Sequence, residues 1–288
     1  MWFHISVQGN GGQSIFHRQK DILHAIDLLG VFSHYHQVKV VAYQILSNHY
    51  HVILECLNPR NFIWGYRISY SRYYNSEYNS FGAVGRFKYS CGEIHDYDKL
   101  EKKLIYVFRN STKHGVRQHP YSDPYNSAQY YFFKERNLSE PKGLKPAGCA
   151  CELEHSTLFI PEHYLLDSKG HIYPRCFLKY DTVENVFKTY SNFIQKISNP
   201  TQQEIEENNG IVPKPKNVKT NDLALSEIIL ETIYPRSIIS LSDTEKVLLC
   251  LKLKDNYPVS IRQFSRVLSI PESTLRWKIS EILRKKGQ

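Results

Sequence analysis

Long apolar runs are missing from this 288-residue sequence. No run approaches the roughly 18 consecutive apolar residues that a membrane-spanning helix needs, so we expect no membrane association. The chain starts Met1-Trp2-Phe3, with neither a basic start nor an apolar signal core, which argues against secretion and favours a cytoplasmic protein. Its six cysteines are scattered, which favours reduced thiols over a disulfide framework. Internal repeats and low-complexity tracts are also missing, which excludes fibrous and repeat architectures.

The composition is that of an ordinary globular protein, with 41% hydrophobic and 23% charged residues and a length that suits about two domains. The net charge of +9 is unevenly distributed. Residues 1–135 carry 15 basic against 10 acidic side chains, residues 136–209 carry 8 against 10, and residues 210–288 carry 14 against 8. Two basic regions around a weakly acidic middle favour a polyanionic partner held by two modules. The 21 tyrosines and 14 phenylalanines, interleaved with Arg and Lys, suit single-stranded nucleic acid, whose bases stack on rings.

The first 135 residues predict an α+β fold, with an antiparallel sheet and flanking helices. Alternating and helical apolar patterns predict strands at 3–7, 39–46, 49–56 and 86–90 and helices at 18–35, 61–78 and 96–113. The two central strands form a hairpin through Ser47-Asn48. The segment Gly9-Asn10-Gly11-Gly12 predicts a sharp turn or a close approach of the backbone to another group.

The C-terminal 60 residues predict a small all-α unit. A helix capped by Ser242 runs to about residue 254, and helices at 260–268 and 272–284 flank a tight turn at Ser269-Ile270-Pro271. This length pattern is typical of a helix-turn-helix, with Thr274, Arg276 and Lys278 on the exposed side of the second helix. A plain three-helix bundle remains the alternative. Before this unit we expect one amphipathic helix at 181–198 and a solvated linker.

Two pairs of residues carry candidate chemistry. His49 and His51 are two apart on a strand, so both imidazoles face one side and can share a divalent metal ion. Tyr106 and Asn110 are four apart on a helix and share a face. A tyrosine hydroxyl can attack a metal-polarised phosphate, and an asparagine oxygen can ligate a hard cation. Taken alone, each pair also fits half-exposed histidines or core packing.

Five ordered segments of residues 1–135 resemble the HUH single-tyrosine transposases, and in particular the REP-associated tyrosine transposases. Together they are far more specific than any one segment. The matching segments are Phe3-His4-Ile5-Ser6 with the following Gln8-Gly9-Asn10 and Ile15-Phe16, Asn48-His49-Tyr50-His51, Gly85-Arg86-Phe87-Lys88, Tyr106-Val107-Phe108-Arg109-Asn110, and His119-Pro120-Tyr121-Ser122. The chain departs from the family pattern at Tyr50, Ser111 and Asp123, which affects substrate details and removes no group that the chemistry needs.

The resemblance implies a single-stranded DNA transposase or endonuclease with an HUH, ferredoxin-like catalytic domain. In it, His49, His51 and Asn110 hold Mg²⁺ or Mn²⁺, and Tyr106 attacks the scissile phosphate, which leaves a 5′-phosphotyrosine link and a free 3′-hydroxyl. A 3′-hydroxyl then reverses the step, so no nucleotide cofactor is needed. The partner is single-stranded or hairpin DNA of REP-like sequence, which implies a nucleoid-associated location. The resemblance leaves open a homodimer in which Tyr106 serves the histidines of a second copy.

Several residues are expected to contact DNA. They are the loop residues Gly9, Asn10, Gly11 and Gly12, the basic residues Arg86, Lys88, Arg109 and Lys113, and the helix-turn-helix residues Thr274, Arg276 and Lys278. For Arg109 and Lys113 a solvated helix face is an equal alternative. The corresponding division of the chain is a catalytic domain at 1–137, a connector at 138–209, a linker at 210–220 and a helix-turn-helix domain at 221–288.

Three other interpretations remain open at this stage. An HUH replication initiator or relaxase would use similar groups, but such proteins usually bring a helicase region, and the sequence contains no Gly-x-x-x-x-Gly-Lys-Ser/Thr loop to supply one. A domesticated, non-catalytic DNA-binding regulator is the second. The third is a zinc site at Cys149, Cys151, His155 and Cys176, for which the spacing is poor.

Overall fold

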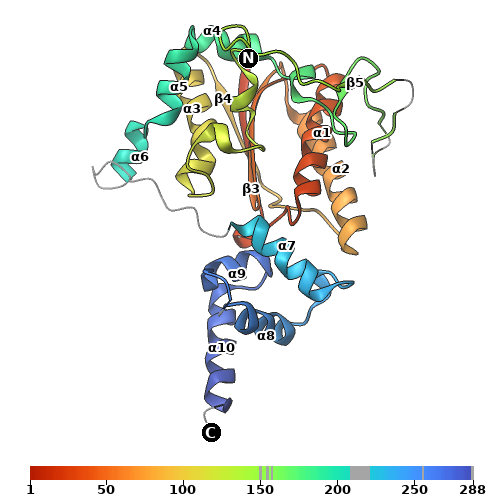
Figure 1. Ribbon diagram of the computed structural model, residues 1–288, viewed down its shortest axis with the longest axis vertical. Coiled ribbons are helices and arrows are strands. Elements are labelled where there is room, and N and C mark those ends of the chain that lie inside the picture. Colours follow the sequence, from red (N-terminus) through yellow and green to blue (C-terminus); the bar gives the residue numbers. More distant parts are fainter. Residues whose placement is uncertain (149–150, 154–155, 157, 208–220, 255, 287–288) are drawn as a thin grey trace.

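The protein, described here by a computed structural model, is an α+β chain with an all-helical C-terminal part (Figure 1). The structure describes residues 1–288 except 149–150, 154–155, 157, 208–220, 255 and 287–288. The expected linker at 210–220, and Cys149 and His155 of the zinc alternative, lie outside the described residues. Among the described residues, no helix is long and apolar enough to cross a membrane.

A four-stranded antiparallel sheet forms the centre of the N-terminal part. Its strands are β1 (Trp2–Gln8), β2 (Lys39–Leu46), β3 (His49–Glu55) and β4 (Ser90–Ile94), in the order β2-β3-β1-β4. Strand β1 pairs with β3 in the register Ser6 opposite His51 and Gln8 opposite His49. Paired residues point to one side of a sheet, so these four side chains share a face.

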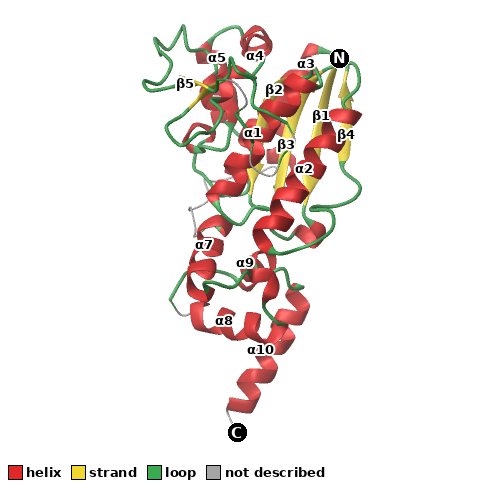
Figure 2. Cartoon of the chain, turned by 90° about the vertical axis from the view of Figure 1, so that its right-hand side faces the viewer, coloured by secondary structure: helices red, strands yellow, loops and turns green. Residues whose placement is uncertain are grey.

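Helices cover both faces of the sheet. On one face lie α1 (Gln19–Tyr35) and α2 (Arg60–Tyr78), and on the other lies α3 (Tyr97–Lys113), as the edge-on sheet of Figure 1 and the face-on view of Figure 2 show. The hairpin and all three helices expected here are confirmed within one or two residues. Asp96 caps α3 by accepting a hydrogen bond from the Lys99 N–H at 2.7 Å.

The tyrosines of α2 contradict the expectation, drawn from composition, that the aromatic side chains stack on the bases of a nucleic acid. Tyr66, Tyr70, Tyr73, Tyr74 and Tyr78 are buried in the core between α2, α1 and the sheet. Their rings therefore pack inside the protein and are not available to stack on bases. Most of the aromatic content of this helix stabilises the fold.

The fourth strand begins four residues later than predicted. Arg86 and Lys88 lie in the loop before β4, after Gly85, which has a positive φ of 81°. A side chain at Gly85 would approach Val7 and the Gln8 carbonyl, so this residue also allows the loop to touch the end of β1. The turn delays the start of the strand.

The middle of the chain is less regular and packs on both sides of the sheet. Its first part, with Tyr164 and Phe177, joins the core on the α1 side, and its second part, with Phe187 and Phe193, joins the core on the α3 side. The prediction of a single helix at 181–198 is wrong, because the chain forms two helices there, α4 (Tyr180–Phe187) and α5 (Tyr190–Ser198). The first helix ends at Lys188, which has a φ of +67°, and Thr189 caps the second. The other elements here are short: β5 (Lys145–Pro146), β6 (Leu165–Leu166) and α6 (Gln202–Glu207).

The C-terminal part is a set of helices around its own core, which includes Val247, Phe264 and Leu275. The helices are α7 (Asp222–Ile233), α8 (Asp243–Lys254), α9 (Ile261–Val267) and α10 (Glu272–Lys286), and they lie below the sheet in Figure 1. The turn between α9 and α10 places Ser269 at a φ of +54°, the position where glycine is commoner. Helices α8, α9 and α10 match the predicted ranges within two residues, whereas α7 was not predicted. The assignment of this part as a DNA-binding helix-turn-helix stays a prediction.

The C-terminal helices dock on the segment between β1 and α1. The Ser14 N–H donates to the Arg266 carbonyl at 3.0 Å, and the buried His17 ring shares a hydrogen bond of 3.1 Å with the Ser226 hydroxyl. Arg266 also pairs with Asp222 at 2.6 Å. These contacts bring α9 beside the loop that follows β1.

Candidate active site

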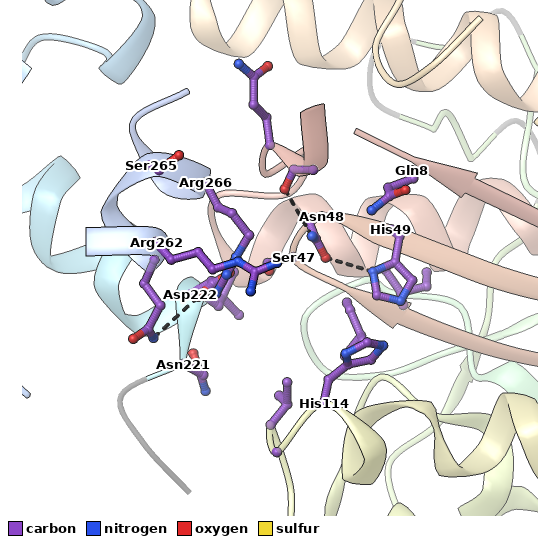
Figure 3. Close-up of a pocket in the computed structure, with 18 of the residues that line it drawn as sticks. Gln8, Ser47, Asn48, His49, His114, Asn221, Asp222, Arg262, Ser265 and Arg266 are labelled. Carbon is purple, nitrogen blue, oxygen red and sulfur yellow. Dashed lines mark hydrogen bonds and ion pairs between the residues drawn. The ribbon is translucent and has the colours of Figure 1, made fainter. Parts of the chain in front are cut away.

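A cleft of about 1260 Å³ lies between the α3 face of the sheet and the start of the C-terminal helices. Its sheet side is lined by His49, His51 and Tyr106, and its far side by Arg262 and Arg266 of α9. Figure 3 shows Asn48 and His49 on one side of this space and Asp222 and the two arginines on the other. The cleft therefore connects the predicted catalytic residues to the C-terminal helices.

The strand pairing gathers polar side chains at one end of the sheet. His51 shares a hydrogen bond of 3.1 Å with His4 of β1, from its Nδ1 to the His4 Nε2, and the two rings are stacked. His49 and His51 lie with ring centroids 5.2 Å apart. Ser6 and Gln8, their cross-strand partners, also line the cleft. His4, which the sequence analysis did not assign to the site, supports His51 from the neighbouring strand.

Helix α3 brings Tyr106 and Asn110 to these histidines. Its apolar side, with Leu104, Val107 and Phe108, is buried against the sheet and against α5. The same packing turns the side with Tyr106 and Asn110 towards the histidines, since residues four apart share a helix face. The Tyr106 ring lies edge-on to the His51 ring, at 5.3 Å between centroids.

A buried polar network holds α3 at this distance from the sheet. Asn126 donates to the Phe108 carbonyl at 2.7 Å, and Gln44 of β2 donates to the Asp123 carboxylate at 2.9 Å. Asn126 and Gln44 are in turn hydrogen-bonded to each other. Asp123, one of the departures from the family pattern, thus contributes to the positioning of α3, which was not expected from its place in the sequence.

The amide of Asn48 orients His49. The Asn48 Nδ2 donates to the Gly12 carbonyl at 3.0 Å, so its Oδ1 faces the His49 Nδ1 at 2.7 Å, as the dashed lines of Figure 3 show. Burial lowers the pKa of His49, so the ring is neutral at pH 7 and carries one proton. With that proton on Nδ1, donated to Asn48, the His49 Nε2 has a free lone pair.

The lone pair of the His49 Nε2 faces another hydrogen-bond acceptor, the Asn110 Oδ1. Two acceptors that face each other are an arrangement that a cation would fit. The His49 Nε2 lies 2.7 Å from the Asn110 Oδ1, while the buried Asn110 Nδ2 has no hydrogen-bond partner. A cation ligated by both acceptors would satisfy them, and so would a half-turn of the Asn110 amide in the metal-free protein. Burial also lowers the pKa of His51 well below its ordinary value, so this ring too is a neutral ligand. The residues therefore fit a divalent ion.

The same donor set indicates weak metal affinity in the free protein. Among the described residues, no three His, Cys, Asp or Glu side chains are grouped so that they could hold a metal ion. Two neutral imidazoles and an amide oxygen bring no negative charge to a divalent cation. Additional ligands must come from water or from a bound anion such as a phosphate.

The glycine loop lies beside His49. Its Gly9 N–H donates to the Asn48 carbonyl at 2.8 Å, and a side chain at Gly9 would stand 1.9 Å from the Gln13 carbonyl oxygen. Residues Asn10–Gly12 form a short 3-10 turn, and Gly11 and Gly12 line the cleft. Glycine is thus required for the loop to pack closely behind the Asn48–His49 pair.

Three of the basic residues that were expected to contact DNA have different surroundings. Arg86 lines the cleft and is exposed. Lys113 pairs with Glu207 at 2.8 Å, and its ammonium lies 5.7 Å from the centroid of the Tyr106 ring. Arg109 is buried and holds Glu204 with both ends of its guanidinium, so it fixes α3 to α6 and offers no group to a phosphate. We therefore remove Arg109 from the predicted DNA contacts.

The predicted contacts of the C-terminal helices lie along α10, outside the lining of the cleft. Arg276 is exposed and pairs with Glu272 one turn earlier, and Lys278 pairs with Asp243 of α8. Thr274 is half-buried. Arg262 of α9 is exposed and faces the cleft from the C-terminal part. It was not predicted as a site residue, because no short sequence pattern marks the contact between α9 and the end of the sheet.

Comparisons with known proteins give one distant similarity. No protein-family model and no curated protein matches the chain. A solved structure described as "Structure of the REP associates tyrosine transposase bound to a REP hairpin" is similar over 48% of this chain and 81% of that chain, with 16% sequence identity and a TM-score of 0.37. A similarity this distant carries no argument, so the proposal below rests on the side chains of the cleft.

Proposed function

We propose that this protein is a metal-assisted, single-stranded DNA transposase or endonuclease that cleaves and rejoins DNA through Tyr106. The observation that carries the proposal is the convergence of Tyr106, Asn110, His49 and His51 at one end of a cleft. They come from a strand and a helix more than 50 residues apart in the chain. A tyrosine hydroxyl, an asparagine amide and two neutral imidazoles brought together in one cleft are the groups that this reaction uses.

Each residue has a role in the proposed reaction. The Tyr106 oxygen forms a bond to phosphorus as the bond from phosphorus to the 3′-oxygen breaks, and one proton leaves the tyrosine while the departing 3′-oxygen gains one. His51, supported by His4, and His49, oriented by Asn48, present neutral nitrogens to the site. The phosphodiester energy is kept in the 5′-phosphotyrosine link, so the step can be reversed by a 3′-hydroxyl.

His49, His51 and Asn110 would hold Mg²⁺ or Mn²⁺. When bound, the ion supplies charge stabilisation at the non-bridging phosphate oxygens. Lys103 and Lys113 add positive charge around the nucleophile, since their ammonium groups lie 5.5 and 5.7 Å from the centroid of the Tyr106 ring. The glycine loop, Arg86 and Lys88 are proposed to position the DNA backbone.

The direct test is a cleavage assay with the full-length protein. Labelled single-stranded and hairpin oligonucleotides are incubated with protein and Mg²⁺ and then separated on denaturing gels. We expect a cleaved strand and a protein-linked fragment with single-stranded or hairpin substrates, and neither product in excess chelator. The absence of both products over a broad set of REP-like hairpins would contradict the proposal.

The C-terminal helices are proposed to add affinity and site choice through a helix-turn-helix. The double variant Arg276→Ala/Lys278→Ala should bind hairpin DNA more weakly and reduce the salt slope of binding by about two, because each lost phosphate contact removes nearly one released counterion. Binding is measured by fluorescence anisotropy over a range of salt concentrations. Arg236→Ala/Lys252→Ala is the matched control, with one exposed position in the turn after α7 and one on α8. An unchanged slope in the first variant would count against a DNA-binding α10.

A further inference from the structure

Two of the most exposed aromatic rings of the protein lie on one loop. This aromatic loop, residues 79–89, joins α2 to β4. Phe81 and Phe87 in it are 95% and 88% exposed. Full exposure of a phenylalanine ring costs free energy in the isolated protein, so two such rings on one short loop indicate an interaction surface.

The base of the aromatic loop is tied to α2. Asn75 donates to the Gly82 carbonyl at 2.8 Å, and the Val84 N–H donates to the Ser71 hydroxyl at 3.0 Å. Both bonds join the backbone of the loop to the last turns of one helix. The rings are therefore carried on an anchored backbone.

A second set of bonds holds the part of the loop around Phe87. The Arg67 guanidinium of α2 donates to the Arg86 carbonyl at 2.6 Å and to the Phe87 carbonyl at 3.2 Å. The Arg86 N–H donates to the Gln8 carbonyl, at the end of β1, at 2.7 Å. Phe87 thus has a fixed backbone and a free ring, which lowers the entropy cost of a contact made by that ring.

The same bonds place Phe87 next to the cleft. Gln8 lies directly opposite His49 in the sheet, and Arg86 lines the cleft together with both. Phe87 is one residue further along the chain. A nucleic acid strand that lies over His49 and Arg86 and follows this loop would therefore meet Phe87 next.

We propose that Phe87 is a stacking platform for an unpaired base of the strand bound in the cleft, just beyond the phosphate that Arg86 contacts. The inference deepens the proposed function and rests on it for the path of the strand. The neighbouring residues identify the partner, because Arg86 and Lys88, which precede and follow Phe87 in the sequence, are exposed and complement a phosphate backbone. An apolar protein partner would leave these two cations without a counter-charge.

The test measures binding without chemistry. A fluorescein-labelled single strand of 20 thymidines is titrated with full-length protein in EDTA, with anisotropy as the readout. Phe87→Ala should weaken binding about tenfold, as loss of one base–aromatic stack typically does, and Phe87→Trp should restore it. Trp64→Ala, which removes an exposed ring on α2 of the same part of the protein, should bind as the wild type does.

Two comparisons decide the outcome. Binding of a 20-base-pair duplex should change far less between Phe87→Ala and the wild type, because base pairs inside a duplex are stacked on both faces and present no free face. An unchanged single-strand affinity in Phe87→Ala, or an equal loss on the duplex, would overturn the stacking proposal. Absence of cleavage by the wild type, with binding still dependent on Phe87, would instead contradict the proposed enzyme and leave the stacking platform standing.

Discussion

Tyr106→Phe will abolish the covalent link between protein and DNA. The substitution removes the attacking oxygen and keeps the ring, so its contacts with His4 and His51 and the packing of α3 should persist. We expect cleavage to fall by at least about a thousandfold, since loss of a nucleophile removes the reaction path itself. The thermal midpoint and the affinity for DNA should stay close to the wild-type values.

The label is placed to identify the linked end. A 3′-labelled single strand should yield a labelled protein with the wild type, because the tyrosine keeps the 5′ end of the downstream fragment. Tyr97→Phe, an exposed tyrosine at the start of the same helix, is the matched control and should form the adduct normally. Peptide mapping that finds the label on any tyrosine other than Tyr106 would make the assignment of α3 as the catalytic helix wrong.

His49→Ala and His51→Ala should each lower cleavage more than about a hundredfold, beyond the 10- to 100-fold that loss of an outer-shell partner typically costs. Both rings are neutral in the folded protein because burial lowers their pKa values. Their removal therefore leaves no uncompensated charge, and both variants should stay folded. The thermal midpoint should fall more in His51→Ala than in His49→Ala, because the buried His4 nitrogen loses its hydrogen-bond partner. His34→Ala, at an exposed position of α1, is the control and should cleave normally.

Metal binding gives a readout that does not depend on cleavage. Mn²⁺ is titrated calorimetrically into the Tyr106→Phe protein with bound single-stranded DNA, which supplies phosphate oxygens without being cleaved. We expect Mn²⁺ binding in this complex and its loss when His49→Ala or His51→Ala is added. Full cleavage by the wild type in excess chelator would rule out the metal-assisted reaction.

The hydrogen bond between His4 and His51 could not be predicted from the local sequence pattern alone. The alternation along β1 places His4, Ser6 and Gln8 on one face, and this is readable from the sequence. That this face is the face of His49 and His51 depends on the register between β1 and β3, which pairs Ser6 with His51. A register shift by one residue would turn the whole set to the opposite side of the sheet.

Arg109, on a helix, is a second residue whose contacts could not be predicted from its near neighbours in the sequence. It lies next to Asn110 in a basic segment, so a phosphate contact was a reasonable expectation. Its partner, Glu204, is 95 positions further along the chain in α6, and the two meet only because α5 and α6 pack beside α3. Burial of that ion pair removed Arg109 from the surface.

By itself the sequence determined what depends on near neighbours: the hairpin that carries His49 and His51, the helix on which Tyr106 and Asn110 share a face, and the extents of α8, α9 and α10. These follow from periods of two and 3.6 residues and from capping residues, which act over a few positions. Only the tertiary structure decided the distance between the two pairs, the place of Arg262 across the cleft and the exposure of Phe87. The reason is physical: contacts between distant segments depend on how complete faces pack together, and that packing is a property of the whole chain.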